Sequence, residues 1–257
     1  MKSPRLLSFL FILLFLAACG SEAPAKPTTV ATPQATPTPA ITPTATIPQV
    51  SSHLVHFKTS DNVQLAGSLY GSGKAFVICS HELSTDKKIW ENSGVPQRLA
   101  SLGYQVLAYD FRGNGDSEGT SDITILDTDL RAAIAFVKKQ GATKIVLLGS
   151  SMGGTASLKV AANTNVAAVI TLSSPEMFPT NVTDDDVKAI KAPKLFVNSK
   201  FDTYSEDTIH MHSIAKDPKE LQMYEGNLHG TAIFDSDNGD KLTQLILKFV
   251  THYAPVH

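Results

Sequence analysis

The sequence of 257 residues has little of several features that mark particular classes of protein. Its two cysteines are too few for the disulfide framework of a small secreted domain. Its 22 basic and 24 acidic residues nearly balance, so we expect no nucleic-acid partner. The one long apolar run, 6–18, is too short and too N-terminal for a bundle of membrane spans. An apolar fraction of 42% nevertheless predicts a folded core.

The N-terminus has the pattern of an export signal. Lys2 and Arg5 precede the apolar run, and the small residues Ala17 and Ala18 end it. The sequence 16–19, Leu-Ala-Ala-Cys, resembles the end of a bacterial lipoprotein signal, which is cleaved before a cysteine that then carries acyl chains. This resemblance implies a signal peptide over residues 1–18 and a lipid anchor on Cys19 at the extracytoplasmic face of a bacterial cell membrane. The alternative is an ordinary secretory signal with a cysteine there by chance.

The segment after Cys19 has a different composition. Residues 22–50 contain seven Pro, eight Thr and six Ala, with neither glycine nor aromatic residues. Such a segment cannot bury enough apolar surface to offset its ordering entropy, so we predict a disordered tether over residues 19–50. Its reach would be about 90 Å if it were fully extended. Thr/Pro-rich composition is also typical of glycosylated stalks.

Beyond the tether, short apolar runs alternate with helical patterns. The expected strands are 63–70, 75–79, 105–109, 144–148, 166–172, 194–197 and 221–224. The expected helices are 88–102, 124–139, 152–163, 205–215 and 239–252. Nearly continuous apolar strands are typical of a parallel sheet covered on both faces. The alternation therefore predicts one domain over residues 51–257, a three-layer α/β/α sandwich with a mostly parallel sheet.

The segment 149–153 fits the pattern G-x-S-x-G directly between an expected strand and an expected helix. This pattern is typical of a nucleophilic serine on a sharp turn, where side chains at Gly149 and Gly153 would collide with the backbone. The turn would expose the hydroxyl of Ser151 at a helix N-terminus, which favours developing negative charge. Ser150 is out of register with both glycines.

Serine needs a base, and the candidate is His229, in a glycine-rich loop after the last expected strand. Asp202, after the strand before, would orient the imidazole. Alone, His229 could be a solvated surface residue and Asp202 a helix N-cap. The chain order Ser, Asp, His favours the catalytic interpretation because it matches the order in one known fold.

These motifs carry a family resemblance. Residues 54–252 resemble the α/β-hydrolase family, especially its cap-poor esterase, dienelactone-hydrolase and peptidase-like members. Segment 149–154 resembles the nucleophile turn, 226–230 the histidine loop, and 110–117 the D-x-R-G-x-G-x-S loop, in which we expect Arg112 to pair with carboxylates as scaffold. The resemblance implies an eight-stranded sheet, no cofactor, and hydrolysis of an ester, thioester or amide of a small molecule or peptide through an acyl-serine intermediate.

The expected oxyanion hole departs from the family pattern. The resemblance implies backbone N–H donors from Leu83 and Met152, but the usual His-Gly is here His81-Glu82. Glu82 would be tolerated at negative φ and strained at positive φ. This departure favours a second hypothesis, a lipid-anchored binding or scaffold protein with a degenerate hydrolase fold. An aspartate-nucleophile dehalogenase is disfavoured because serine occupies position 151.

Two patterns suggest metal sites but fail on spacing, so we expect no metal. His210 and His212 are two apart and would not share a helix face. Segment 235–240 resembles a calcium loop, but its glycine is misplaced and Ile246 stands where Glu is needed, so helix capping explains it better.

Other conspicuous residues have structural explanations. We expect Cys79 to be a buried small hydrophobe, Trp90 to pack in the core rather than line the pocket entrance, and 184–186 to begin a solvated helix. Only residues 174–192 separate two expected strands where relatives often insert a lid. A small or absent lid predicts an open site that is permissive toward short acyl groups or larger substrates, and we expect short p-nitrophenyl esters to react faster than long ones.

Overall fold

The computed structural model describes residues 46–178 and 180–256. The signal peptide predicted over residues 1–18, Cys19 and most of the predicted tether lie outside this part of the chain. Within it, no helix is both long and apolar enough to span a bilayer.

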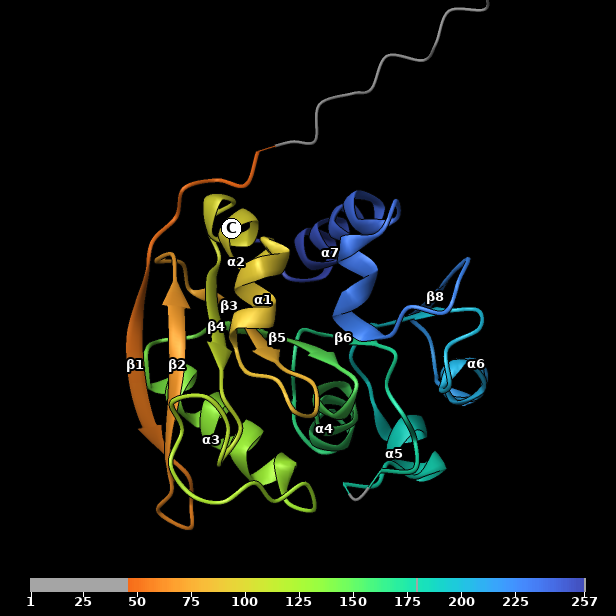
Figure 1. Cartoon of the computed structure of the whole chain (residues 1–257). Coiled ribbons are helices and arrows are strands. Elements are labelled where there is room, and N and C mark those ends of the chain that lie inside the picture. The colour runs from red at the N-terminus through yellow and green to blue at the C-terminus, as the bar shows by residue number, and fades with distance from the viewer. Residues whose placement is uncertain (1–45, 179, 257) are drawn as a thin grey trace, which may run out of the picture. The chain divides into compact units, whose positions relative to one another are not determined.

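The described residues form an eight-stranded sheet in the order β1-β2-β4-β3-β5-β6-β7-β8 (Figure 1). The strands are β1 Ser52–Lys58, β2 Gln64–Tyr70, β3 Ala75–Ser80, β4 Gln105–Tyr109, β5 Lys144–Ser150, β6 Ala168–Leu172, β7 Lys194–Ser199 and β8 Lys219–Tyr224. β2 runs antiparallel to β1 and β4, and every other neighbouring pair is parallel. β3, β6 and β7 are buried along their whole length, as their continuous apolar sequences predict.

Helices cover both faces of this sheet (Figure 1). They are α1 Lys88–Ser93, α2 Val95–Ser101, α3 Leu126–Lys139, α4 Met152–Ala161, α5 Asp184–Ala189, α6 Ser205–Ile214 and α7 Gly239–Tyr253. Helices α1, α2 and α7 contribute apolar side chains to the core on one face, and α3, α4, α5 and α6 to the core on the other. The predicted three-layer α/β/α sandwich is therefore confirmed.

Two elements differ from the sequence prediction. β1 was not expected, because most of its residues are exposed and it pairs with β2 as an edge hairpin. The single helix expected over 88–102 is divided at Gly94, whose φ of 71° ends α1, and α2 begins with Val95 and Pro96. Glycine readily adopts this left-handed conformation, and proline is well tolerated in a first helical turn.

In segment 235–240, where we expect helix capping, the side chain of the residue that directly precedes α7 does not cap the helix. The Asn238 side chain makes no capping hydrogen bond to the described residues, and the Asn238 N–H instead donates to Ser236 Oγ at 3.1 Å. Trp90 is fully buried edge-to-face on Phe234, so its packing role is confirmed. Cys79 is buried, and burial raises the pKa of its thiol, so it behaves as the expected small hydrophobe.

Candidate active site

Ser151 occupies the turn between β5 and α4, where its backbone adopts the strained angles φ 49° and ψ −122°. The two flanking glycines make the turn possible. A Cβ atom on Gly149 would lie 2.2 Å from the Gly153 carbonyl oxygen, and one on Gly153 would lie 2.3 Å from the Ser80 carbonyl oxygen. The sharp turn predicted from the G-x-S-x-G pattern is therefore present.

The structure brings the imidazole and the carboxylate into contact. His229 Nδ1 lies 2.7 Å from Asp202 Oδ2, and Asp202 Oδ1 accepts the Tyr204 N–H at 2.8 Å just before α6 begins. Asp202 thus orients the histidine with one oxygen and supports the start of a helix with the other. Because Nδ1–H donates to Asp202, Nε2 of the neutral ring is free to accept a proton.

His229 and Asp202 shift each other's pKa. The hydrogen bond to Asp202 raises the pKa of His229; burial acts against this, and the charges of Asp202 and Glu82 add to it. Burial alone would raise the pKa of Asp202, but hydrogen bonds from His229 and the Tyr204 N–H outweigh it and hold this pKa below its usual range. Asp202 is therefore ionised at neutral pH, and its charge stabilises an imidazolium.

Ser151, Asp202 and His229 line one open pocket of about 440 Å³. The other lining residues are Glu82, Leu83, Phe178, Phe201, Thr203, Tyr204 and Asn227. Among the described residues no hydrogen bond joins Ser151 Oγ to His229. Such a contact often forms only in the complex with substrate. The pocket therefore contains a hydroxyl, an imidazole and a carboxylate from three different strand ends, as the sequence predicts.

The loop after β3 leaves a backbone amide available beside this pocket. The Glu82 carbonyl oxygen accepts hydrogen bonds from His81 Nδ1 at 2.7 Å and Thr85 Oγ1 at 2.8 Å. Because a trans peptide directs its C=O and N–H in opposite directions, the Leu83 N–H points away from these partners. Within the described residues it has no hydrogen-bond partner, and Leu83 lines the pocket. Met152, the first residue of α4, has the free amide of a helix N-terminus.

The backbone of Glu82 does not adopt the strained positive-φ conformation that would argue against catalysis. Among the described residues, positive φ angles outside glycine occur at Asn62, Ser84, Ser151 and Ser173, so Glu82 avoids the left-handed region. The loop places this conformation at Ser84 instead, with φ 60°. A side chain at position 82 is therefore compatible with the loop.

Sequence reasoning missed the residues that hold the histidine loop. Ser199 Oγ donates to the Leu228 carbonyl oxygen at 2.6 Å, and Ser173 Oγ accepts the Gly230 N–H at 2.8 Å. Ser173 in turn donates to Asn198 Oδ1 at 2.7 Å. These polar residues all lie at strand ends, which was the available signal, but no spacing distinguished them from ordinary loop residues.

The D-x-R-G-x-G-x-S loop is a charged scaffold, as predicted. Arg112 bonds the buried carboxylate of Asp129 and the half-exposed carboxylate of Asp61, each at a shortest distance of 2.7 Å. Asp110 accepts hydrogen bonds from the backbone N–H and the Nζ of Lys87, at 2.7 and 2.6 Å. The expectation that Arg112 pairs with carboxylates is confirmed.

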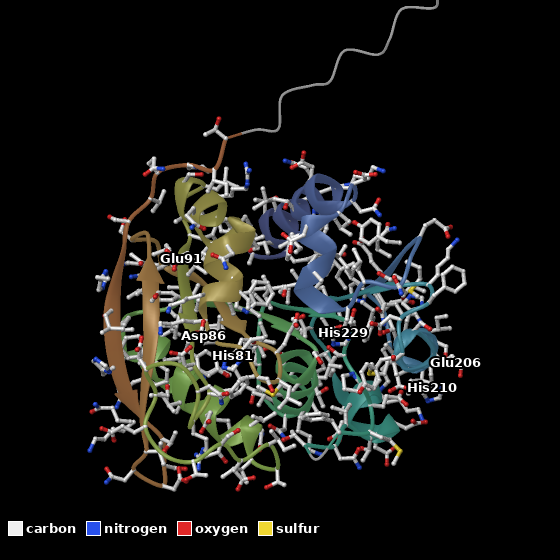
Figure 2. All side chains as sticks on the ribbon, in the orientation of Figure 1. His81, Asp86, Glu91, Glu206, His210 and His229 are labelled. Carbon is white, nitrogen blue, oxygen red and sulfur yellow. The ribbon has the colours of Figure 1, made fainter. Side chains whose placement is uncertain are left out.

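One cluster in the described part of the chain brings three potential metal-ligand atoms within 4.8 Å of one another: Glu176, Asp184 and His210 (His210 is labelled in Figure 2). His210 Nε2 lies 3.1 Å from Asp184 and 3.7 Å from Glu176, and the Asp184 contact raises the His210 pKa. An internal ion pair accounts for this half-exposed group. His212 packs against Phe196 instead, so the two histidines have different surroundings, as their spacing predicts.

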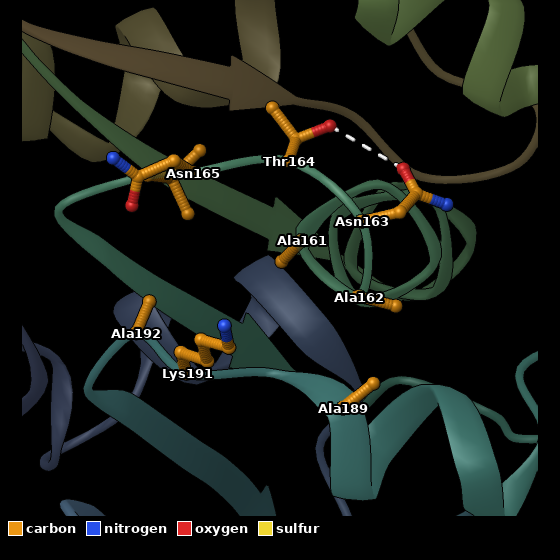
Figure 3. A pocket seen from close by; sticks show the side chains of 9 residues that line it. Ala161, Ala162, Asn163, Thr164, Asn165, Ala189, Lys191 and Ala192 are labelled. Carbon is orange, nitrogen blue, oxygen red and sulfur yellow. Dashed lines mark hydrogen bonds between the residues drawn. The ribbon is translucent and has the colours of Figure 1, made fainter.

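A second hollow, of about 310 Å³, lies near the N-terminal ends of β6 and β7 (Figure 3). Its lining consists of Ala161–Val166, Ala189, Lys191 and Ala192. Lys191 is its one titratable side chain among the described residues. This hollow lacks the imidazole and carboxylates that line the Ser151 pocket.

Comparison with known proteins agrees with this geometry. A family model described as the alpha/beta hydrolase fold matches residues 75–207, which include β3 to β7 and the Ser151 turn. The chain belongs to the α/β-hydrolase fold family. The family match ends before His229, so the histidine loop of this α/β hydrolase is identified by its contact with Asp202.

Two curated relatives align with about half of this α/β hydrolase. It is 28% identical over 133 residues to the quorum-quenching protein AidA of Acinetobacter baumannii, aligned over 48% of this chain and 43% of that protein. It is 31% identical over 130 residues to the bifunctional epoxide hydrolase 2 of Sus scrofa, over 49% and 23%. The chain thus spans less than half the length of either relative.

Solved structures share the fold over most of the chain. The esterase Pf2001 of Pyrococcus furiosus superposes with a TM-score of 0.69 at 19% identity, covering 79% of this chain and 93% of the esterase. The esterase domain of a Rhodothermus marinus protein has a TM-score of 0.63 at 22% identity, covering 79% and 99%. At these identities the likeness shows the fold alone.

Proposed function

We propose that this α/β hydrolase cleaves an ester through an acyl-serine intermediate, with thioesters and amides as chemically related substrates. The observation that carries the proposal is the pocket in which Ser151, on a strained turn, lies with His229, whose Nδ1 is bound to Asp202. Serine at the turn favours this chemistry over an aspartate nucleophile. The esterase descriptions of two proteins with the same fold support it.

The reaction follows from the available donors and acceptors. Ser151 Oγ attacks the acyl carbon while His229 Nε2 takes its proton. The Leu83 and Met152 amides stabilise the oxyanion, and each donor is worth about 3–4 kcal/mol in the transition state. The carbonyl bond re-forms as the leaving group departs with the proton from His229. Water, activated by the same imidazole, then hydrolyses the acyl-serine.

The direct test is a fluorophosphonate probe applied to the full chain. We expect covalent labelling of the wild type and none of Ser151→Ala, with Ser101→Ala, at an exposed site on α2, as the control that retains the label. Folded wild-type protein that takes no label and hydrolyses no ester would instead favour the alternative, a non-catalytic binding lipoprotein. The tolerated backbone at Glu82 supports the enzyme over this alternative.

The pocket favours short, uncharged acyl groups. It is open and of modest volume, and Glu82 and Asp202 place carboxylates in its lining, which disfavours anionic substrates. We expect p-nitrophenyl acetate and butyrate to react faster than long-chain esters and faster than a p-nitrophenyl hemisuccinate. A preference for long chains or for the anionic ester would contradict this substrate class.

The anchoring part of the proposal is that Cys19 carries acyl chains and holds the domain at the outer face of a bacterial membrane. Cys19→Ala should then move the protein from the membrane fraction to the soluble fraction. Cys79→Ala is the matched control, because Cys79 is buried in the core and should leave the fractionation unchanged. Membrane association that survives Cys19→Ala would contradict lipidation.

A further inference from the structure

The Glu82 side chain lies where the loops after β3, β5 and β8 meet. Its Oε1 atom accepts three hydrogen bonds: from Ser150 Oγ at 2.6 Å, from the Thr231 N–H at 2.6 Å and from Thr231 Oγ1 at 2.9 Å. Within the described residues, no lysine or arginine forms a salt bridge with this carboxylate. The donors that hold it are therefore neutral groups on two loops that are remote in the sequence.

Gly230 gives independent evidence that this contact is built into the fold. A Cβ atom at position 230 would lie 2.1 Å from Glu82 Oε1 and 2.5 Å from Ser150 Oγ, and the backbone there has a φ of 56°. Because Gly230 has no side chain, there is room for the Glu82 carboxylate and for the Ser150 hydroxyl that donates to it. The histidine loop and Glu82 are thus shaped to fit each other.

The three donors are close in sequence to the reacting groups. Ser150 immediately precedes Ser151, and Thr231 follows His229 by two residues. Glu82 is itself next to Leu83, which lines the pocket. One carboxylate oxygen therefore connects the nucleophile turn, the histidine loop and the oxyanion loop.

We propose that Glu82 is a positioning residue that sets the Ser151 turn against the His229 loop and whose negative charge stabilises the imidazolium formed during acyl transfer. This inference rests on the proposed hydrolase function. The charge effect has a geometric basis, because Glu82 and His229 line the same pocket and the Glu82 carboxylate is bonded to Thr231, two residues after His229. The other titratable groups that face His229 are Asp202, at 2.7 Å, and Tyr204, whose ring centroid lies 5.6 Å from that of the imidazole. Of these, Asp202 and Glu82 are the acidic groups that favour the charged ring.

Two substitutions separate the two effects. Glu82→Ala removes the acceptor and should lower kcat by about 10²-fold with a smaller change in KM, because a small misplacement of reacting groups costs about that much. Glu82→Gln keeps an acceptor oxygen and removes the charge. It should recover most of the lost kcat and move the acidic limb of the kcat/KM profile to lower pH. Glu91→Ala and Glu91→Gln, at an exposed site on α1, are the matched controls and should change neither quantity.

The glycines supply a second comparison within the same loop. Gly230→Ala should displace the carboxylate and lower kcat more than Gly226→Ala does. Both positions have positive φ, but a Cβ atom at Gly226 meets nothing within 4 Å. The difference between the two variants therefore reports the crowding of the Cβ atom at position 230 against Glu82 Oε1 and Ser150 Oγ.

Several outcomes would overturn the inference. Wild-type kcat in Glu82→Ala, or a Glu82→Gln variant that loses as much kcat as Glu82→Ala, would exclude positioning through the hydrogen bonds. An unshifted pH limb in Glu82→Gln would exclude the charge effect, and this test stands even if Glu82→Ala fails to fold. If the wild type takes the fluorophosphonate label while these effects are absent, the Glu82 inference alone fails. A wild type without label or turnover overturns both proposals.

Discussion

The loop after β4 and the loops around Ser151 belong to the same sheet, but they differ in how their polar groups are paired. In the loop after β4 each buried charge has an opposite charge beside it. Asp110 lies against Lys87, and Arg112 lies between Asp129 and Asp61. Such pairs are costly to break, because the remaining partner is left buried and uncompensated.

Around Ser151 the polar groups are only partly satisfied by the protein. Asp202 and Glu82 accept hydrogen bonds mainly from neutral groups and from a histidine, and the Leu83 amide has no partner in the described residues. Ser151 is also held in a strained backbone conformation. Complete pairing of buried charges therefore stabilises the fold. Free hydrogen-bond donors and backbone strain instead mark the place where a reacting molecule would supply the missing contacts.

The strongest test of this difference is Ser151→Ala. We expect kcat for a p-nitrophenyl ester to fall on the order of 10⁶-fold, because the nucleophile is lost from a unit that acts together. The free energy of unfolding, measured by urea titration, should change by less than about 0.5 kcal/mol, because alanine keeps the Cβ atom and the site makes no stabilising pair. A large loss of stability would break the comparison.

Asp202→Asn should lower kcat by about 10⁴-fold. The amide can still accept the Tyr204 N–H, but its NH₂ group would favour the wrong tautomer of His229. Circular dichroism should show a folded protein. Activity within about tenfold of the wild type would mean that Asp202 only supports the start of α6.

Arg112→Ala should have the opposite effect, lowering stability and leaving activity unchanged. Removing the guanidinium leaves the fully buried Asp129 without its partner, and we expect a loss of about 3–5 kcal/mol in the free energy of unfolding. The folded fraction should keep its kcat. Lys188→Ala, which breaks an exposed pair with Asp184, is the control and should leave the free energy of unfolding nearly unchanged.

The smallest predicted effect is on the pH profile. His229 must be neutral to accept a proton, and Asp202 raises its pKa, so the acidic limb of kcat/KM should lie above 6.5, the usual value for histidine. The same contact stabilises the fold below the unfolded pKa of His229, and this contribution is lost as pH rises through the folded value. Any residual activity of Asp202→Asn should show the limb at lower pH. A wild-type limb below 6.5 would contradict the contact.

Much of the fold was predictable because its strands are buried and its helices follow them in regular alternation. Ser151, Asp202 and His229 were identifiable because each directly follows such a strand or its short loop. β1 escaped prediction because an exposed edge strand needs no apolar pattern. The break at Gly94 was missed because an isolated glycine within a helical pattern is often tolerated.

The contacts of Glu82 could not be predicted from the sequence. Its partners Ser150 and Thr231 lie 68 and 149 residues away along the chain, and no local pattern records such pairing. From the sequence, Glu82 was a departure from the glycine of the family pattern, a reason to expect weak catalysis and a carboxylate near the site. The structure shows where its carboxylate is held and that its backbone is unstrained by positive φ.

The most direct test is to trap the acyl-enzyme. The full chain is mixed with p-nitrophenyl acetate, quenched in acid within the first turnover, and analysed by peptide mass spectrometry. We predict one added acetyl group on the peptide that contains Ser151, and none on the same peptide of Ser151→Ala. Ester hydrolysis with no acetylation of Ser151, or acetylation that persists elsewhere in Ser151→Ala with full turnover, would contradict the account.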